Sequence, residues 1–249
     1  MSGAYSDFAR FYDKLQKDVP YGEIAALIHS FINKYGSEHE VIAELACGTG
    51  SLSMELAKLG YDVYGIDLSQ DMLNEAFEKK YDSGMENLTY LCQDMTELDL
   101  YGAADSIVCV LDSINHLGSF EEVEKTFERA SMFVCEGGLF IFDVNTLYKH
   151  RKILGDNAFN FDMEGLFCCW QNELRDDDGV NIYLDFFEEE SDGRYSRYSE
   201  NFTEMYFELS DMEKSLLKNN FDIIGIYDGF SENPVKKDSQ RALYVCRKK

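Results

Sequence analysis

The sequence predicts an α/β protein that combines a doubly wound, largely parallel sheet with an antiparallel β insertion. Apolar runs of strand length alternate with helical periods over the first 148 residues. From about residue 149 to residue 209 a period of two replaces this rhythm, and two more strand patterns follow. We therefore expect five parallel strands plus two late strands, one of them antiparallel.

The first half of the chain supplies these strands and helices in turn. Apolar groups at helical spacing predict a helix over residues 22–35, with Gly36 as its stop. Ser69 and Ser119 are expected to cap later helices through their hydroxyl groups. The expected strands are residues 41–46, 62–67, 88–92, 104–111 and 139–144, and the expected helices are 51–59, 69–80 and 119–134.

The second half predicts the insertion and the return to the sheet. Aromatic and β-branched residues favour three antiparallel strands, separated by turn sequences at 176–179 and 191–193. Ser210 is expected to cap the last helix. The three strands are residues 165–174, 180–189 and 194–207; the helix is 211–219, and the final strands are 221–227 and 241–246. We expect a core of residues 1–148 and 210–249 and a β-rich lid of residues 149–209.

Charge and composition restrict the partners. The 249 residues include 47 acidic and 23 basic side chains, a net charge of −24 that repels nucleic acid and anionic membranes. We expect a small-molecule substrate, no nucleic acid, no membrane, and a monomer or homodimer. Residues 1–8 have no signal-peptide features, which favours the cytoplasm. The seven cysteines are interpreted as reduced core residues without a metal site.

A glycine turn joins the first predicted strand to its helix. Glu44-Leu-Ala-Cys-Gly-Thr-Gly50 lies where open α/β sheets bind ligands, beyond the carboxyl ends of the strands. Gly48 and Gly50 allow close approach of a cofactor, and the helix start offers free N–H groups. A purely structural glycine turn is the alternative.

Two aspartates strengthen the nucleotide-site interpretation. Asp67 ends the second strand, where a carboxylate can accept both hydroxyls of an adenosine ribose. Asp94 follows the third strand and is suited either to an adenine amino group, with Met95 on the ring, or to capping a helix. The two interpretations of Asp94 stay open.

The segments around Glu44, Asp67 and Asp94, together with the last two strands, resemble class I S-adenosylmethionine-dependent methyltransferases, a Rossmann-like family. The chain is most similar to bacterial small-molecule members, including amino-sugar and glycine N-methyltransferases, which share an aromatic amino-terminal segment and a β insertion. The corresponding pieces here are residues 8–13 and 149–209. Ala46 departs from the family pattern, because many relatives have glycine there.

The resemblance implies S-adenosylmethionine as the cofactor and gives roles to individual residues. Ala46, Gly48 and Gly50 would line its methionine part, Asp67 would hold the ribose, and Asp94 with Met95 the adenine. Glu44 would contact the methionine amino group or orient the loop. Further expected cofactor contacts are Cys47, Leu68, Met72 and Leu111.

The loop after the fourth strand, residues 111–117, is expected to flank the transferred methyl group. His116 could accept a proton from an amine or hydroxyl nucleophile, or could only anchor the loop. Tyr12 is the second candidate for catalysis, although tyrosines in such a segment often pack on the core. Expected substrate contacts are Tyr21, Asp112, Asn115, Trp170 and Tyr198.

The lid is expected to present aromatic side chains to the sheet edge and to carry negative potential. Residues 155–213 hold seventeen acidic and three basic side chains. The expected aromatic groups are Phe167, Trp170, Tyr183, Phe186 and Tyr198.

Two other functions compete with methyl transfer. A nicotinamide-dependent oxidoreductase shares the glycine turn and the acidic strand end, but Ser53 occupies the position of its third glycine. A non-catalytic S-adenosylmethionine-binding protein would keep the pocket without turnover. An in-line displacement at a sulfonium needs alignment more than acid/base groups, so the lack of a nucleophile or metal motif does not argue against an enzyme.

Overall fold

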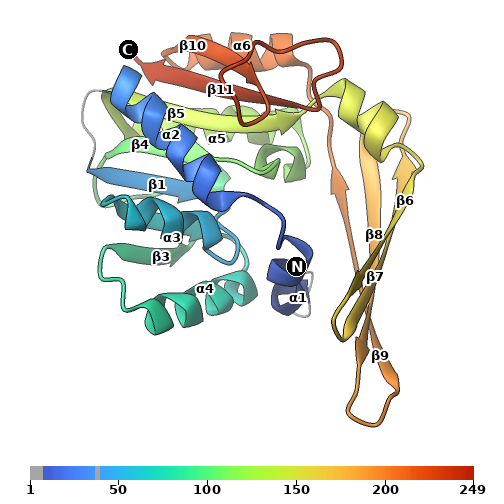
Figure 1. Cartoon of the computed structure of the whole chain (residues 1–249). Helices are drawn as coiled ribbons and strands as arrows, with labels where there is room; N and C mark the ends of the chain where they lie inside the picture. The colour runs from blue at the N-terminus through green and yellow to red at the C-terminus, as the bar shows by residue number, and fades with distance from the viewer. Residues whose placement is uncertain (1–7, 37–39) are drawn as a thin grey trace.

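The structure is a computed structural model that describes residues 8–36 and 40–249. Residues 1–7, on which most of the expectation about an export signal rests, lie outside the described residues. The described chain forms a seven-stranded sheet flanked by helices and a separate four-stranded sheet (Figure 1).

The larger sheet confirms the predicted fold class. Its strands lie in the order β10-β11-β5-β4-β1-β2-β3. Only β11 runs antiparallel to its neighbours, β5 and β10. The bounds are β1 (Val41–Leu45), β2 (Asp62–Asp67), β3 (Leu88–Cys92), β4 (Ala104–Cys109), β5 (Val134–Asn145), β10 (Phe221–Asp228) and β11 (Arg241–Lys248). The order reverses at β1, which places the glycine turn at the switch point of the sheet.

Helices cover both faces of this sheet because its strands are apolar on both sides. Alternate residues of β1 show the division: Ile42 packs with α2, α3 and α4, whereas Ala43 packs with α5 and α6. The bounds are α2 (Tyr21–Tyr35), α3 (Ser51–Lys58), α4 (Gln70–Ser83), α5 (Phe120–Phe133) and α6 (Leu209–Lys218), with short helices η1 (Met95–Glu97), η2 (Ser113–His116) and η3 (Lys149–Leu154).

Two predicted caps are confirmed and one is wrong. The hydroxyl groups of Ser69 and Ser119 accept bonds from the backbone at the starts of α4 and α5. Ser210 does not cap α6, which begins one residue earlier, because the Glu208 carbonyl already accepts the first helical bonds. The strand predicted from residue 139 begins at Val134 and passes Gly138 with a register shift, where a Cβ would lie 2.4 Å from the Asp105 carbonyl oxygen.

The smaller sheet has four strands rather than the three predicted. Its order is β6-β7-β8-β9, all antiparallel. The missed strand, β6 (Ala158–Met163), alternates apolar and polar residues and joins β7 through a turn at Glu164 and Gly165. The other strands are β7 (Leu166–Leu174), β8 (Val180–Glu189) and β9 (Tyr195–Glu204).

A short helix, α1 (Phe8–Leu15), connects the two sheets (Figure 1). The Phe11 ring stacks on Phe186 of β8 with 5.0 Å between centroids, and Phe8 lies 6.3 Å from Phe202 of β9. Met72 of α4 belongs to the same apolar cluster. The inner face of the small sheet is therefore covered by α1.

The seven cysteines are all free, and four of them are buried. Cys92 is exposed, which corrects the expectation that it is a core residue. Cys168 and Cys169 lie on opposite faces of β7, as their adjacency predicts. Among the described helices, none is long and apolar enough to cross a membrane.

Candidate active site

The candidate site lies at the carboxyl ends of β1, β2 and β4, where the glycine turn, Asp67 and η2 meet. A small cavity there is lined by six of the predicted residues. These are Tyr12, Tyr21, Glu44, Ala46, Cys47 and Leu111. Gly48 and Asp67 lie beside it at the end of β2.

The glycine turn uses left-handed backbone at three alternate positions. Ala46 has φ 52°, Gly48 has φ 55° and Gly50 has φ 75°. The conformation of Ala46 costs an alanine about 1 kcal/mol or more, which explains why glycine is the usual residue there. A Cβ on Gly50 would lie 2.1 Å from the Tyr90 hydroxyl, so this glycine also has a packing reason. A Cβ on Gly48 would point toward the Tyr12 ring, 3.9 Å away.

Asp67 holds the turn through its carboxylate. One oxygen accepts a bond from the Gly48 N–H and the other from the Ser69 N–H, each at 2.8 Å. Burial raises the pKa of Asp67, and these two backbone bonds oppose the rise. A carboxylate has about four acceptor positions, so Asp67 can accept further hydrogen bonds. Leu68, beside it, is 69% exposed and forms part of the open rim.

Glu44 lies at the end of β1 and is almost fully buried. Its carboxyl group accepts a short hydrogen bond from the Ser53 hydroxyl. Burial, with a smaller contribution from Asp67, raises the pKa of Glu44 to about 8. The protein therefore supplies a neutral acid that a cationic group could ionise. Ser53 stands where a nicotinamide-binding motif has its third glycine, and here its side chain forms a hydrogen bond to Glu44.

Asp94 caps a short helix. Its Oδ1 accepts bonds from the Thr96 N–H and hydroxyl, both at 2.8 Å, which supports the capping interpretation. Met95 is half-buried and packs against the core. Met72 is 5% exposed and packs with α1, so the structure gives it a core position.

An ion-pair network that the sequence did not reveal holds the loop after β4. Leu111 and Asp112 both have left-handed backbone, and their N–H groups donate to the Asp143 carboxylate at 2.5 and 3.1 Å. Arg241, from β11, pairs with both Asp112 and Asp143. Burial acts to raise the pKa of Asp112, but Arg241, Lys149 and His116 hold it well below its usual range. Asp112 is thus an anchored anion at the rim.

His116 ends η2 and is exposed to solvent. Its ring lies 5.1 Å from the Phe202 ring of β9. Donor atoms of Asp112, His116 and Glu204 all lie within 4.8 Å of one another. Glu204, at the end of β9, is buried and was missed because it is remote in sequence. Histidine and carboxylates close together can share a proton or ligate a cation.

Asn115, which was expected to contact the substrate, makes hydrogen bonds within the protein. It is fully buried, its Nδ2 donates to the Met205 carbonyl, and its Oδ1 accepts from the Asn145 N–H. Its amide therefore joins η2 to the residue that follows β9.

Only part of the predicted aromatic lid faces inward. Strand pairing places Trp170, Phe186 and Tyr198 on the inner face, whereas Phe167 and Tyr183 point to the opposite face. Trp170 donates to the Asn172 side chain and Tyr198 packs on Phe11, 5.4 Å between centroids. The structure thus gives Tyr198 a contact with α1, and places Phe202 beside His116 instead.

Tyr12 and Tyr21 close the cavity from α1 and α2. Burial, followed by Tyr21 and Asp112, raises the pKa of Tyr12 well above its usual range, so its hydroxyl remains a neutral donor. Asp13 ties α1 to the glycine turn, since it accepts from the Thr49 hydroxyl at 2.7 Å and pairs with Lys79 of α4.

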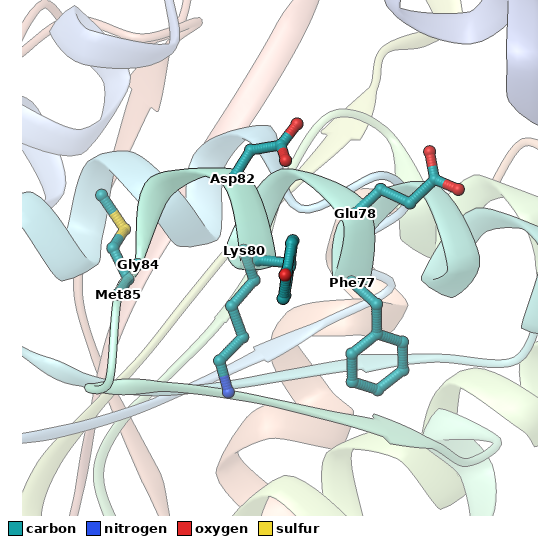
Figure 2. A pocket seen from close by; sticks show the side chains of 7 residues that line it. Phe77, Glu78, Lys80, Asp82, Gly84 and Met85 are labelled. Atoms are coloured by element: carbon teal, nitrogen blue, oxygen red, sulfur yellow. The ribbon is translucent and has the colours of Figure 1, made fainter.

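A second hollow lies on the surface of α4. Figure 2 shows Phe77 and Lys80 pointing together on one side of the helix, with Glu78 and Asp82 directed away from them. It is near the end of α4 farthest from Ser69, roughly 15 Å along the helix. It does not belong to the site described above.

Known proteins resemble this chain over its whole length. The family described as a methyltransferase domain matches residues 42–138. A protein of Geobacillus sp. (strain WCH70) that carries a methyltransferase name is 31% identical over 246 residues, covering 98% of this chain and 99% of that protein.

Solved structures show the same fold. An S-adenosylmethionine-dependent methyltransferase from Clostridium acetobutylicum ATCC 824 is 33% identical, with a TM-score of 0.88 and 98% of both chains covered. The sugar N-methyltransferase KedS8 from Streptoalloteichus sp. ATCC 53650 is 16% identical, with a TM-score of 0.77, covering 100% of this chain and 94% of that chain.

Proposed function

The chain belongs to the S-adenosylmethionine-dependent methyltransferases, and from that premise we propose that its acceptor is a small molecule with a nitrogen or oxygen nucleophile. S-Adenosylmethionine is the methyl donor, which sets the nicotinamide alternative aside. We propose the class of acceptor, the residues that hold the methyl donor and the acceptor, and the group that takes the proton.

The residues at the switch point fit the donor. The backbone at Ala46 and Gly48 is left-handed, and a Cβ on Gly48 would project toward the Tyr12 ring. We assign Glu44 to the methionine ammonium group and Asp67 to the ribose hydroxyls. Residues 94–95 and Leu68 are assigned to the adenine side, and Cys47 and Leu111 to the methionine side.

The bound donor supplies an electrophilic methyl group: the acceptor lone pair bonds to its carbon as the carbon–sulfur bond breaks with both electrons to sulfur. The protein has to align the acceptor, exclude water and accept one proton. His116 ends η2, the short helix whose Ser113 lines the cavity, and its ring is exposed, so we assign it as the base. The Tyr12 hydroxyl, neutral and close to the glycine turn, is assigned to orienting the acceptor.

The arrangement of His116 between Asp112 and Glu204 carries the proposal. Anionic groups around an exposed imidazole favour an acceptor that arrives as a cation and leaves a proton behind, which is how an amine behaves near neutral pH. The name of KedS8, a sugar N-methyltransferase with the same fold, supports nitrogen. We propose Asp112 and Tyr21 at the acceptor side, with Trp170 on the inner lid face.

An acceptor screen with labelled S-adenosylmethionine tests the proposal. We expect transfer to a subset of small amines or alcohols, and none to RNA or protein. His116→Asn should lower kcat by about tenfold or more, within the range for general bases. For an amine acceptor, KM should rise with ionic strength, because salt screens the acidic mouth. Labelling of a macromolecule with no small-molecule turnover would contradict the proposal.

A further inference from the structure

The end of β9 is fastened to the loop that carries His116. The Met205 N–H donates to the Asn115 carbonyl at 2.7 Å, and Asn115 Nδ2 returns a bond to the Met205 carbonyl at 2.8 Å. The Asn115 side chain also accepts from Asn145 of β5. These two hydrogen bonds between Asn115 and Met205 fix the end of the lid sheet relative to η2.

Two side chains of β9 therefore reach His116 from one face of the strand. Phe202 and Glu204 are two residues apart, so they point the same way. The Phe202 ring lies 5.1 Å from the imidazole ring, tilted by 36°. Donor atoms of Glu204 and His116 lie within 4.8 Å of each other. One side chain thus packs on the ring, and the other places a carboxyl group near it.

Glu204 is 4% exposed and differs from the neighbouring acids in its partners. Asp112 and Asp143 are paired with Arg241. Among residues 8–36 and 40–249, no lysine or arginine forms an ion pair with Glu204, which accepts a neutral bond from Asn145 Nδ2 at 2.7 Å. A buried carboxylate without a cationic partner is costly, so a cation forming nearby is stabilised by it.

We propose that Glu204 is a positioning residue that holds the His116 imidazole and stabilises its protonated form during methyl transfer. This inference rests on the proposed role of His116 as base. A cationic amine first gives one proton to a ring nitrogen of His116, which frees the nitrogen lone pair that then bonds to the methyl carbon; a hydroxyl acceptor gives up its proton to the same ring as its oxygen bonds. The imidazolium is then the counter-charge of Glu204. The proton later leaves to solvent from the exposed ring.

The surrounding charges are consistent with this pairing. Asp112 and His116 of the η2 region face Glu204. Lys149 of η3 is linked to Glu204 by way of Asn145, because its ammonium group donates a hydrogen bond to Asn145 Oδ1 at 2.9 Å. Burial and Asp112 raise the pKa of Glu204, while His116 and Lys149 lower it. The charge of Glu204 therefore depends on the charge of the imidazole.

The same three donor groups could instead ligate a divalent cation. Two cations, Lys149 and Arg241, already offset Asp112 and Asp143, which favours proton stabilisation over metal binding. The experiment therefore also tests whether these groups bind a divalent cation.

Nuclear magnetic resonance of the full chain labelled with ¹⁵N-histidine tests the proposal without an acceptor. His116→Asn assigns the signal among the four histidines. At pH 6.5 we expect Glu204→Gln to lower the protonated fraction of His116 by about twofold or more. Glu204→Asp, which keeps the charge but retracts it, should have a smaller effect. Glu128→Gln, an exposed acid of α5, makes the same change in net charge and should have none.

Three results would overturn the proposal. The first is an unchanged His116 signal in Glu204→Gln that still binds S-adenosylhomocysteine. If that variant misfolds, the smaller decrease expected in Glu204→Asp must still be measurable, and its absence overturns the proposal. The second is broadening of the His116 signal by micromolar Mn²⁺ that Glu204→Gln abolishes, which would identify metal ligands. The third is a kcat of Glu204→Gln equal to wild type with an identified acceptor, where we expect a loss of about threefold or more at unchanged KM for the donor. Full activity of His116→Asn would instead refute the base itself.

Discussion

At the residue scale, three acids of the site, one buried and two partly buried, have different electrostatic environments. Asp112 is held ionised by Arg241, whereas Asp67 relies on two backbone N–H groups. Glu44 has only the Ser53 hydroxyl and stays largely protonated at neutral pH. Burial alone therefore does not determine the charge of a carboxyl group here; its partners do.

The two aspartates that begin and end β2 form a matched pair for testing the ribose assignment. Asp67→Ala should raise the Kd for S-adenosylhomocysteine by about tenfold or more, since it removes the proposed acceptor and frees the Gly48 N–H. Asp62→Ala, at the exposed start of the strand, should leave Kd unchanged. Titration calorimetry on both variants measures this. Equal affinity in folded Asp67→Ala would rule out the assignment.

Glu44 predicts a proton change on cofactor binding. Because burial raises its pKa to about 8, the carboxyl group is mostly protonated at pH 6.5. An ammonium group placed beside it favours the ionised form, so binding should release about one proton, and affinity should rise with pH toward 8. Binding enthalpies in buffers of different ionisation enthalpy count the protons. Glu44→Gln should release none, while Glu78→Gln, an exposed acid of α4, should behave as wild type.

At the element scale, α1 acts as a cover held by a polar contact. Asp13 bonds to Thr49 of the glycine turn and pairs with Lys79 of α4, and Lys79 also donates to Thr49 and Ser51 at 3.0 Å. Tyr12, which precedes Asp13 in α1, faces Gly48. We infer that these contacts keep Tyr12 over the cofactor.

Lys79→Met should therefore weaken S-adenosylhomocysteine binding by about two- to fivefold, the size expected for a partly exposed pair. Asp13→Asn should have a similar effect, and the double variant should lose less than the product of the two losses. Lys80→Met, in the second hollow on the surface of α4 (Figure 2), is the control. Independent, multiplicative losses would show that the two residues do not act through each other.

Local patterns predicted most elements, and non-local pairings account for what was missed. The helix over 21–35 and the strands at 62–67 and 88–92 follow directly from apolar periodicity. Strand β6 was missed because Glu164-Gly165 is a short turn within an apolar stretch. The inward side of the lid was only half predicted, since alternation divides a strand into two faces without telling which one is covered by α1.

The same contrast between local patterns and non-local pairings applies to the site residues. Glu44, Gly48 and Asp67 could be proposed from the sequence because each follows or ends a strand at a recognisable position, and the structure brings Gly48 and Asp67 into contact. Glu204 and Arg241 were missed because they reach the loop after β4 from strands far along the chain. Asn115 was expected at the substrate because of its position, and only the packed structure reveals its bonds to Met205, just after β9, and to Asn145.

At the scale of the whole molecule, the lid joins the parallel core through two segments: η3 after β5, and residues 205–208 before α6 (Figure 1). His150, in η3, is fully buried, and its ring lies 6.0 Å from that of Tyr206 in the second segment. Neither ring nitrogen has a hydrogen-bond partner among the described residues. The junction of core and lid thus contains an ionisable group that packs as an apolar ring.

This junction predicts a loss of stability in mild acid. Burial lowers the pKa of His150 in the folded protein, so the unfolded chain binds a proton first as pH falls. The stabilisation by neutral His150 is complete above pH 6.5 and is lost as pH falls below it toward the folded-state pKa, at about 1.4 kcal/mol per unit of pKa difference. Urea unfolding between pH 7.5 and 5.5 measures it. His150→Phe should flatten the pH dependence, whereas His29→Gln on α2 should not. An equal slope in wild type and His150→Phe would show that the junction of core and lid does not sense pH through His150.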